Sequence, residues 1–252
     1  MDILHLTDIV RETDSIFFSD SLRGDVRKKG DCDFVTRADT EISAYLHKRL
    51  ADEFLDIGFM SEEEEHSCQQ KRYWILDPID GTTNFMYSLG LSAVSLGLCE
   101  NGEITCGVIY LPHSNEMFYA QKGQGAYLNG KKIVCNKKTE LSECLTAMEL
   151  NAYFKTPCDE TLRQVQSIYT KCRDIRCFGC AAVSLAYIAC GRLDLFLGRF
   201  LKPWDYAAGQ IIVAEAGGVL APLEGKADIS RLNTHIVSAC DPSLLDNFKD
   251  IL

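Results

Sequence analysis

The chain has 252 residues, of which 46% are hydrophobic and 25% charged, and its formal net charge is −10. This length suggests one large domain or two small lobes with room for a packed core. The acidic charge argues against a wide basic face for nucleic acid, and no apolar run reaches the roughly 18 residues of a membrane span. The N-terminus has no basic segment ahead of an apolar stretch. We therefore expect a cytoplasmic protein with neither nucleic acid nor a membrane as a partner.

The N-terminal half of the chain predicts two helices followed by meandering strands. Apolar residues at helical spacing predict an amphipathic helix within residues 3–22 and a second helix over about 40–54. A buried strand is expected over 56–60. From 91 to 134 the pattern changes to strands, and the Asn-Gly pairs in this region favour two-residue hairpin turns.

The C-terminal half mixes helices and strands. Helical patterns cover three stretches: 159–171, 181–190 and 242–252. A strand is expected over 194–197. A further helix follows Trp204 and Asp205 and ends at the glycine pair Gly217 and Gly218, which is typical of a helix C-terminus.

Twelve cysteines are scattered along the chain, most of them inside apolar patterns. We expect a reduced pool of small core residues, as in cytosolic proteins. Cys177 and Cys180 form a CxxC pair, which could be a redox pair or half of a zinc site. Because the sequence has no second pair at zinc spacing, the simpler interpretation is two small residues packed under the start of a helix.

An apolar strand runs directly into two aspartates in the most informative part of the sequence. Asp77 and Asp80 are followed at once by Gly81, Thr82 and Thr83. Hard divalent cations prefer carboxylate oxygens, and phosphate is bound by free backbone N–H groups at a glycine turn that opens a helix. Two acids three positions apart would repel each other unless a cation lay between them. The segment therefore predicts a place where metal ions and a phosphate group meet.

Three more acids lie in comparable settings. Glu62 follows the predicted strand at 56–60, Asp205 stands at the start of a helix, and Asp39 lies just before the helix at 40–54. Taken alone, each has a structural explanation. Glu62 could belong to a solvated acidic loop, and the two aspartates could be plain N-caps.

Taken together, these segments resemble the inositol monophosphatase family of Mg²⁺-dependent phosphatases. Residues 74–85 (WILDPIDGTTNF) match the family's first signature along its whole length, and residues 204–218 match the second. Residues 61–63 resemble its acidic motif, and residues 35–39 its valine-threonine-aspartate motif. The resemblance runs from about residue 1 to 252. It implies a layered α/β fold, an αβαβα sandwich like those of inositol monophosphatase and fructose-1,6-bisphosphatase, usually assembled as a homodimer.

The resemblance also implies a set of metal ligands. Glu62, Asp77 and the carbonyl group of Ile79 would hold the first Mg²⁺. Asp77, Asp80 and Asp205 would hold the second, with Asp77 bridging the two ions. A third, weaker ion would lie near Glu62, giving two to three ions per site.

The phosphate side of the site follows from the same resemblance. Gly81, Thr82 and Thr83 would bind the phosphate, and Asp39 would orient the Thr82 hydroxyl. Glu62, Asp39 and Thr82 would act in catalysis by positioning and activating the attacking water. Two residues would steady the surrounding loop without binding the metal: Glu63 and Lys29.

Three positions bear on the substrate. Inositol-specific members carry a glutamate that binds sugar hydroxyls where this chain has Gly198, and a pocket serine where it has Cys177. Both changes remove polar groups that discriminate between substrates. Arg199 is an addition that suits a second phosphate or a carboxylate; the structural alternative is a surface arginine at the end of a strand.

The expected function is Mg²⁺-dependent, Li⁺-sensitive hydrolysis of inositol monophosphate or a similar polyol or sugar phosphate by direct attack of water. Alternative substrates are fructose 1,6-bisphosphate, histidinol phosphate and a nucleotide 3′-phosphate. A different class of function is a binding or regulatory protein that reuses the fold. We expect a single catalytic unit over 1–252, with an N-terminal lobe over about 1–140 and a C-terminal lobe over about 141–252 around one cleft.

Overall fold

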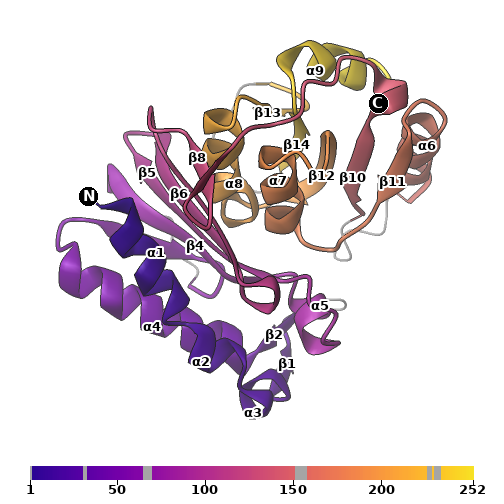
Figure 1. Ribbon diagram of the computed structural model, residues 1–252. Coiled ribbons are helices and arrows are strands. Elements are labelled where there is room, and N and C mark those ends of the chain that lie inside the picture. The colour runs from indigo at the N-terminus through magenta and orange to yellow at the C-terminus, as the bar shows by residue number, and fades with distance from the viewer. Residues whose placement is uncertain (1, 31–32, 65–69, 151–157, 226–228, 230–233) are drawn as a thin grey trace.

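The structure is a computed structural model that describes residues 2–30, 33–64, 70–150, 158–225, 229 and 234–252. Helices and sheets alternate in layers and form an αβαβα sandwich (Figure 1). The layered α/β fold expected from the sequence is therefore confirmed. Within the described residues, no helix is both long enough and apolar enough to cross a membrane.

A seven-stranded sheet forms one β layer, with the strand order β3-β4-β5-β6-β7-β8-β9. Its strands are β3 (Gly58–Ser61), β4 (Arg72–Asp80), β5 (Ala93–Glu100), β6 (Glu103–Leu111), β7 (Glu116–Gln121), β8 (Ala126–Leu128) and β9 (Lys131–Ile133). β3 and β4 are parallel, and the other neighbours are antiparallel. The β5–β6 and β8–β9 hairpins turn at Asn101-Gly102 and Asn129-Gly130, which have positive φ. The two predicted hairpin turns are confirmed.

A five-stranded sheet forms the other β layer, with the strand order β11-β10-β12-β14-β13. Its strands are β10 (Leu145–Glu149), β11 (Asp174–Arg176), β12 (Leu195–Leu201), β13 (Val219–Pro222) and β14 (Thr234–Ala239). β10 runs parallel to β11 and β12, whereas β14 is antiparallel to β12 and β13. The predicted boundary near residue 140 falls between β9 and β10, and the division into two lobes stays a prediction.

Helices cover the outer faces of both sheets and fill the space between them (Figure 1). The outer helices on the large sheet are α1 (Ile3–Arg11) and α4 (Arg37–Glu53), the inner pair is α7 (Ala181–Ala189) and α8 (Pro203–Glu215), and those on the small sheet are α6 (Cys158–Tyr169) and α9 (Pro242–Lys249). The shorter elements are α2 (Asp14–Phe17), α3 (Asp20–Arg23), α5 (Thr82–Met86), the 3₁₀ turns Pro112–Ser114 and Leu141–Glu143, and the ribbon of β1 (Val26–Lys28) and β2 (Phe34–Thr36).

The single helix predicted within residues 3–22 is wrong, because the structure has three helices there: α1, α2 and α3. The chain takes an extended conformation at Ser19, where ψ is 107°. The apolar spacing continues across the breaks, and Leu6, Ile9 and Phe17 are all buried. Spacing alone could not show where the helix would be interrupted.

The hydrophobic core lies on both faces of the large sheet. One cluster, which includes Leu6, Ile42 and Trp74, packs beneath α1 and α4. The other, which includes Phe196 and Ile212, fills the layer between the two sheets. The nine cysteines with described side chains are free, and most of them are buried, as expected for reduced core residues.

Two glycines let α8 approach the large sheet closely. Gly97 on β5 and Gly107 on β6 are direct partners across the two strands. A Cβ on Gly107 would lie 2.7 Å from the carbonyl oxygen and 2.9 Å from the Cα of Ala208, and one on Gly97 would lie 3.2 Å from the Cβ of Ala207. Side chains at these glycines would therefore push α8, and Asp205 in its first turn, away from the sheet.

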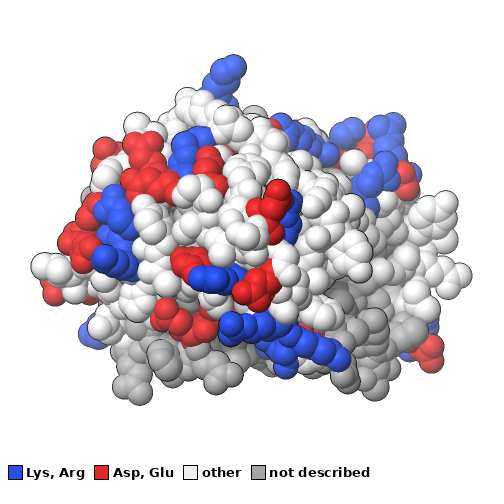
Figure 2. Space-filling view, turned by 90° about the horizontal axis from the view of Figure 1, so that it is seen from below, with Lys and Arg blue, Asp and Glu red and all other residues white. Residues whose placement is uncertain are grey.

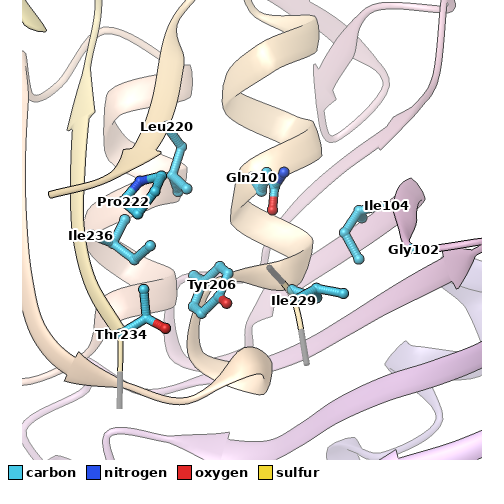
Figure 3. Close-up of a pocket in the computed structure, with 9 residues that line it drawn as sticks. All are labelled: Gly102, Ile104, Tyr206, Gln210, Leu220, Pro222, Ile229, Thr234 and Ile236. Atoms are coloured by element: carbon cyan, nitrogen blue, oxygen red, sulfur yellow. The ribbon is translucent and has the colours of Figure 1, made fainter. Parts of the chain in front are cut away.

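The described surface mixes charges of both signs. On the face shown in Figure 2, lysine and arginine side chains are interspersed with aspartate and glutamate. A small pocket of about 40 Å³ lies between α8, the small sheet and the β5–β6 hairpin (Figure 3). Tyr206 and Gln210 of α8 line it together with Ile104 and Leu220, and none of its lining residues is an acid. This pocket is distinct from the acidic site described next.

Candidate metal and phosphate site

The two aspartates of the first motif lie at the end of a buried strand. Asp77 is 2% exposed, and its Oδ1 accepts a hydrogen bond from the backbone N–H of Ile79 at 3.1 Å. The register of β4 against β5 shifts between Asp77 and Asp80. Gly81 then takes a φ of +80°, and a Cβ there would lie 3.0 Å from the carbonyl oxygen of Leu91. The turn into α5 therefore requires glycine.

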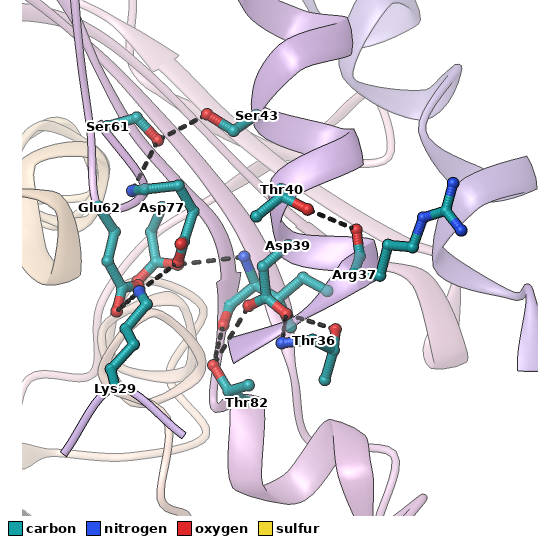
Figure 4. A network of polar contacts seen from close by, with 12 residues as sticks. Lys29, Thr36, Arg37, Asp39, Thr40, Ser43, Ser61, Glu62, Asp77 and Thr82 are labelled. Carbon is teal, nitrogen blue, oxygen red and sulfur yellow. Dashed lines mark hydrogen bonds and ion pairs between the residues drawn. The ribbon is translucent and has the colours of Figure 1, made fainter. Parts of the chain in front are cut away.

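Thr82 follows this turn as the first residue of α5, and its side chain points toward Asp39, which lies on α4 (Figure 4). Its hydroxyl lies 3.4 Å from Oδ1 of Asp39 and 3.1 Å from the carbonyl oxygen of Ile79. Burial raises the pKa of Asp39 to about 6, although hydrogen bonds from Thr36 act in the opposite direction. The structure thus brings together the threonine and the aspartate that the sequence paired. The neighbouring Thr83 is exposed on α5.

Asp39 and Asp205 occupy equivalent places at the starts of α4 and α8. Each is the third residue of its helix, and the N-caps are Thr36 and Lys202. The backbone N–H of Thr36 donates to Oδ2 of Asp39 at 2.8 Å, and that of Lys202 donates to Oδ2 of Asp205 at 2.7 Å. The N-cap alternative is therefore wrong in position, since both acids close the first turn as in a capping box. The Oδ1 atoms of both aspartates take no part in these capping bonds and can contact other groups of the site.

Glu62 follows β3 directly. Lys29 contacts its side chain, and the hydrogen bond between Ser43 and Ser61 holds the end of β3. Lys29 Nζ lies 3.7 Å from Oε1 of Glu62 and 2.6 Å from Oε1 of Glu63. The hydroxyls of Ser43 on α4 and Ser61 on β3 are 2.9 Å apart, which fixes the end of β3 against the helix. The alternative of a freely solvated loop does not fit Glu62 and Glu63, because both are held by Lys29.

Four carboxylates of the site influence one another. Burial raises the pKa values of Glu62 and Asp77 well above their usual range, and the negative charge of Asp205 adds to the effect at both. Burial also raises the pKa of Asp80 to about 6 and that of Asp205 to about 8. The acids predicted to converge from β3, β4 and α8 therefore lie within electrostatic reach of each other.

This donor set fits a hard divalent cation. Buried carboxylates that disfavour each other's charge are stabilised by a cation among them. In the described parts of the chain, no three aspartate, glutamate, histidine or cysteine side chains are already gathered closely enough to hold a metal ion. Mg²⁺ keeps several water ligands and takes oxygens from its substrate, so an open arrangement of a few carboxylates suits it.

Sequence reasoning missed Glu149, the last residue of β10. Its Oε1 accepts from the backbone N–H of Cys180 at 3.2 Å and from the hydroxyl of Ser184 at 3.5 Å. Burial, reinforced by the negative charge of Asp80, raises the pKa of Glu149 to about 8. The only signal in the sequence was a charged residue at the end of an apolar stretch, a pattern too common to point to a site.

The three predicted substrate positions lie in different settings. Cys177 is exposed, and Gly198 lies inside β12. Arg199 is only 3% exposed; its guanidinium donates to Gln164 on α6 and lies 3.5 Å from Oε1 of Glu160. The alternative of a surface arginine at a strand end is therefore wrong, because Arg199 is buried within β12.

Solved structures share this architecture. The extragenic suppressor protein SuhB of Bartonella henselae has a TM-score of 0.90 and 30% sequence identity, over 99% of this chain and 97% of that chain. An IMPase/NADP phosphatase complexed with Mg²⁺ and phosphate has a TM-score of 0.86 over 98% of this chain and 93% of that chain. At 21% identity, the second likeness shows the fold alone.

Sequence comparison places the chain in a family. Residues 5–249 match the model of the inositol monophosphatase family, and the chain belongs to that family. A fructose-1,6-bisphosphatase/inositol-1-monophosphatase of Thermotoga maritima is 38% identical over 200 residues, covering 79% of this chain and 75% of that protein. Nus factor SuhB of Escherichia coli is 34% identical over 233 residues, covering 89% and 87%. The family supports a phosphatase.

Proposed function

We propose that this chain is a Mg²⁺-dependent phosphomonoesterase that hydrolyses inositol monophosphate or a similar polyol or sugar phosphate. The observation that carries the proposal is that Glu62, Asp77, Asp80 and Asp205, at the ends of β3 and β4 and the start of α8, lie within electrostatic reach of one another beside a glycine–threonine turn. Membership of the inositol monophosphatase family supports the same chemistry.

Two to three Mg²⁺ ions would be held by these acids. Glu62, Asp77 and the carbonyl oxygen of Ile79 make one donor set, and a third, weaker ion would lie near Glu62. Asp77, Asp80 and Asp205 make the other donor set. When bound, the ions supply the positive charge that activates a water molecule and stabilises the leaving oxygen.

The chain's own residues then orient the reactants. The backbone N–H groups of Gly81, Thr82 and Thr83 would donate to the phosphate oxygens. Oδ1 of Asp39 lies where it can accept a hydrogen bond from the Thr82 hydroxyl, and a lone pair of that hydroxyl can accept a hydrogen bond from the attacking water. This arrangement holds a water for direct in-line attack and requires no covalent intermediate.

Release of inorganic phosphate from a panel of phosphate esters tests the proposal. Inositol monophosphate should be hydrolysed with Mg²⁺ and not after its removal. Asp80→Asn should lower kcat/KM by about 100-fold or more, since metal charge stabilisation is worth several kcal/mol. Asp174→Asn, at a side chain that is 48% exposed on β11, should behave as wild type. Hydrolysis that is indifferent to Mg²⁺, or a trapped phospho-enzyme, would contradict the mechanism.

A second candidate keeps the chemistry and changes the substrate to fructose 1,6-bisphosphate. The name of the Thermotoga maritima relative, which covers both activities, favours it. The contacts of Arg199 with the buried Gln164 and the exposed Glu160 oppose it, because a second phosphate would have to displace them. Relative rates on the mono- and bisphosphate in the same panel decide between the two, and histidinol phosphate and a nucleotide 3′-phosphate complete the panel.

A binding or regulatory role is the alternative from a different class. The relative named Nus factor SuhB supports it, since its name denotes a factor rather than a phosphatase. The presence of acids at all expected metal-binding side-chain positions, together with Thr82, argues that catalysis is retained. Homodimer assembly, cytoplasmic location and inhibition by Li⁺ are further properties that we propose from the family resemblance.

A further inference from the structure

Glu149 is a carboxylate in the site that the scheme above does not use. It ends β10 and is the direct partner of Gly198 on the neighbouring parallel strand β12. Paired residues on adjacent strands place their side chains on the same face of a sheet. The contacts of Glu149 with Cys180 and Ser184 show that this face looks toward α7.

Gly198 cannot supply a carboxylate of its own on that face. A Cβ at this position would lie 2.4 Å from Cδ1 of Leu201 and 2.8 Å from Cζ of Phe196. A longer side chain would therefore have to displace packed core groups. The carboxylate on this part of the sheet comes from β10 instead.

The first turn of α7 connects Glu149 to the proposed metal ligands. The backbone N–H of Ala182 donates to Oδ2 of Asp80 at 2.6 Å, and the thiol of Cys180 donates to the carbonyl oxygen of Asp80 at 3.5 Å. The backbone N–H of that same Cys180 donates to Glu149. On the other side, after burial itself, the charge of Glu149 raises the pKa of the exposed Cys177. Glu149 thus lies within electrostatic reach of both Asp80 and the exposed Cys177.

Among the described residues, one oxygen of Glu149 has no hydrogen-bond partner. Both hydrogen bonds of its side chain go to Oε1, and among the described residues Oε2 is neither hydrogen-bonded nor counted with the buried unpaired atoms. The side chain as a whole is partly exposed. A carboxyl oxygen in such a place accepts a hydrogen bond from a hydroxyl group, and the group repels an anion once it is deprotonated.

We propose that Glu149 binds a hydroxyl group of the alcohol part of the substrate and so selects neutral polyol phosphates. This inference rests on the proposed phosphatase function. Glu149 is then a specificity-determining residue that discriminates in favour of substrates carrying a hydroxyl near the ester and against those carrying a second anionic group there. Removal of its carboxylate should weaken that preference and leave the phosphate chemistry in place.

Two esters that share a ring but differ in hydroxyls test the proposal. We would measure kcat/KM with Mg²⁺ on inositol 1-phosphate and on cyclohexyl phosphate, which lacks hydroxyl groups. In Glu149→Ala the preference for the inositol ester should fall about 10- to 100-fold, the range for a hydrogen bond to a charged group. The rate on cyclohexyl phosphate should stay within about threefold of wild type. Glu149→Gln, which keeps an acceptor oxygen of the same size, should lose less.

The controls separate this role from a structural one. Glu103→Gln, at a side chain that is 60% exposed on β6, should leave both rates unchanged. Equal losses on both esters in both Glu149 variants would assign Glu149 to holding α7 and overturn the proposal, as would an unchanged preference in Glu149→Ala. A wild-type protein inactive on both esters would instead overturn the proposed function, and this inference with it.

Discussion

The hydroxyl group of Thr82 is held in place by hydrogen-bond acceptors on two different elements. Its hydroxyl lies within reach of two acceptors, Oδ1 of Asp39 and the carbonyl oxygen of Ile79. A hydroxyl has only one proton to donate, so its lone pairs stay directed at other donors. Asp39 is in turn fixed by the N-cap residue of α4. The hydroxyl is therefore pre-oriented by two elements before any substrate enters.

Replacement of Thr82 by valine removes the hydroxyl and keeps the shape and the backbone N–H. We expect kcat to fall about 100-fold, within the range for loss of a positioned proton-transfer group. Mg²⁺ affinity should change little, because no carboxylate is altered. Steady-state kinetics and a Mg²⁺ titration measure the two effects.

Thr40→Val is the matched control for this change. Thr40 is exposed, and its hydroxyl donates to the carbonyl oxygen of Arg37 at 2.9 Å, on the outside of α4. Its kinetics should equal those of wild type. A Thr82→Val enzyme with wild-type kcat would show that the hydroxyl takes no part in the reaction.

At the scale of elements, α8 links the site to the large sheet. Gly97 and Gly107 leave a smooth surface beneath Ala207 and Ala208, so the helix backbone approaches the strands directly. Asp205 stands in the first turn of this helix. The spacing between α8 and the sheet therefore sets the separation between Asp205 and the aspartates of β4.

Gly107→Ala tests this link. The added methyl would lie within 2.7 Å of the α8 backbone, and we expect a loss of about 1–3 kcal/mol in the free energy of unfolding. Mg²⁺ affinity should fall as well, because α8 must shift. Urea denaturation and a Mg²⁺ titration give the two quantities.

Gly24→Ala controls for the loss of a glycine. Its φ is −76°, and the nearest atom to an added Cβ would be 3.4 Å away. Its stability should stay within about 0.5 kcal/mol of wild type. If Gly107→Ala were equally harmless, close packing of α8 could not be what sets the geometry of the site.

At the scale of the whole molecule, the buried acids make stability depend on pH and on metal. The pKa values of Asp80 and Asp205 rise to about 6 and about 8, against about 4 in an unfolded chain. Between these values the folded state binds more protons than the unfolded state. These groups therefore stabilise the metal-free protein fully below about pH 4 and lose that contribution as the pH rises to about 8.

Mg²⁺ should reverse this loss, because it replaces the protons and binds only deprotonated carboxylates. We expect the rise in Tm caused by saturating Mg²⁺ to be about 5 °C or more larger at pH 8 than at pH 5. Thermal unfolding with EDTA or with Mg²⁺, at matched ionic strength, measures it. A Mg²⁺ effect independent of pH would contradict a cation site made of these acids.

Local patterns predicted the parts of the fold that depend on neighbours in the sequence. The helix expected over 40–54 is α4 from Arg37, and the Asn-Gly pairs turn hairpins because both residues tolerate positive φ. The first motif indicated a buried strand, a glycine turn and a short helix, and the structure has all three. Each of these features is determined within about a dozen residues of sequence.

Features that depend on distant pairing could not be predicted. Glu149 joins the site only because β10 pairs with β12 and ends beneath α7. The burial of Arg199 depends on α6 packing over β12. The breaks within residues 3–22 separate α1, which packs on β6 and β7, from α2 and α3, which pack against α4. In each case the deciding contact lies outside the segment itself.

The layered arrangement has a consequence for how the protein is made. Asp205 is carried by a helix that lies between the two sheets, whereas Asp77 and Asp80 belong to a strand formed from the first third of the chain. A nascent chain leaving the ribosome exposes those two aspartates long before α8 is synthesised. The proposed metal pocket therefore closes only after the second sheet and the inner helices have docked, and phosphate release would report complete folding of the newly made molecule.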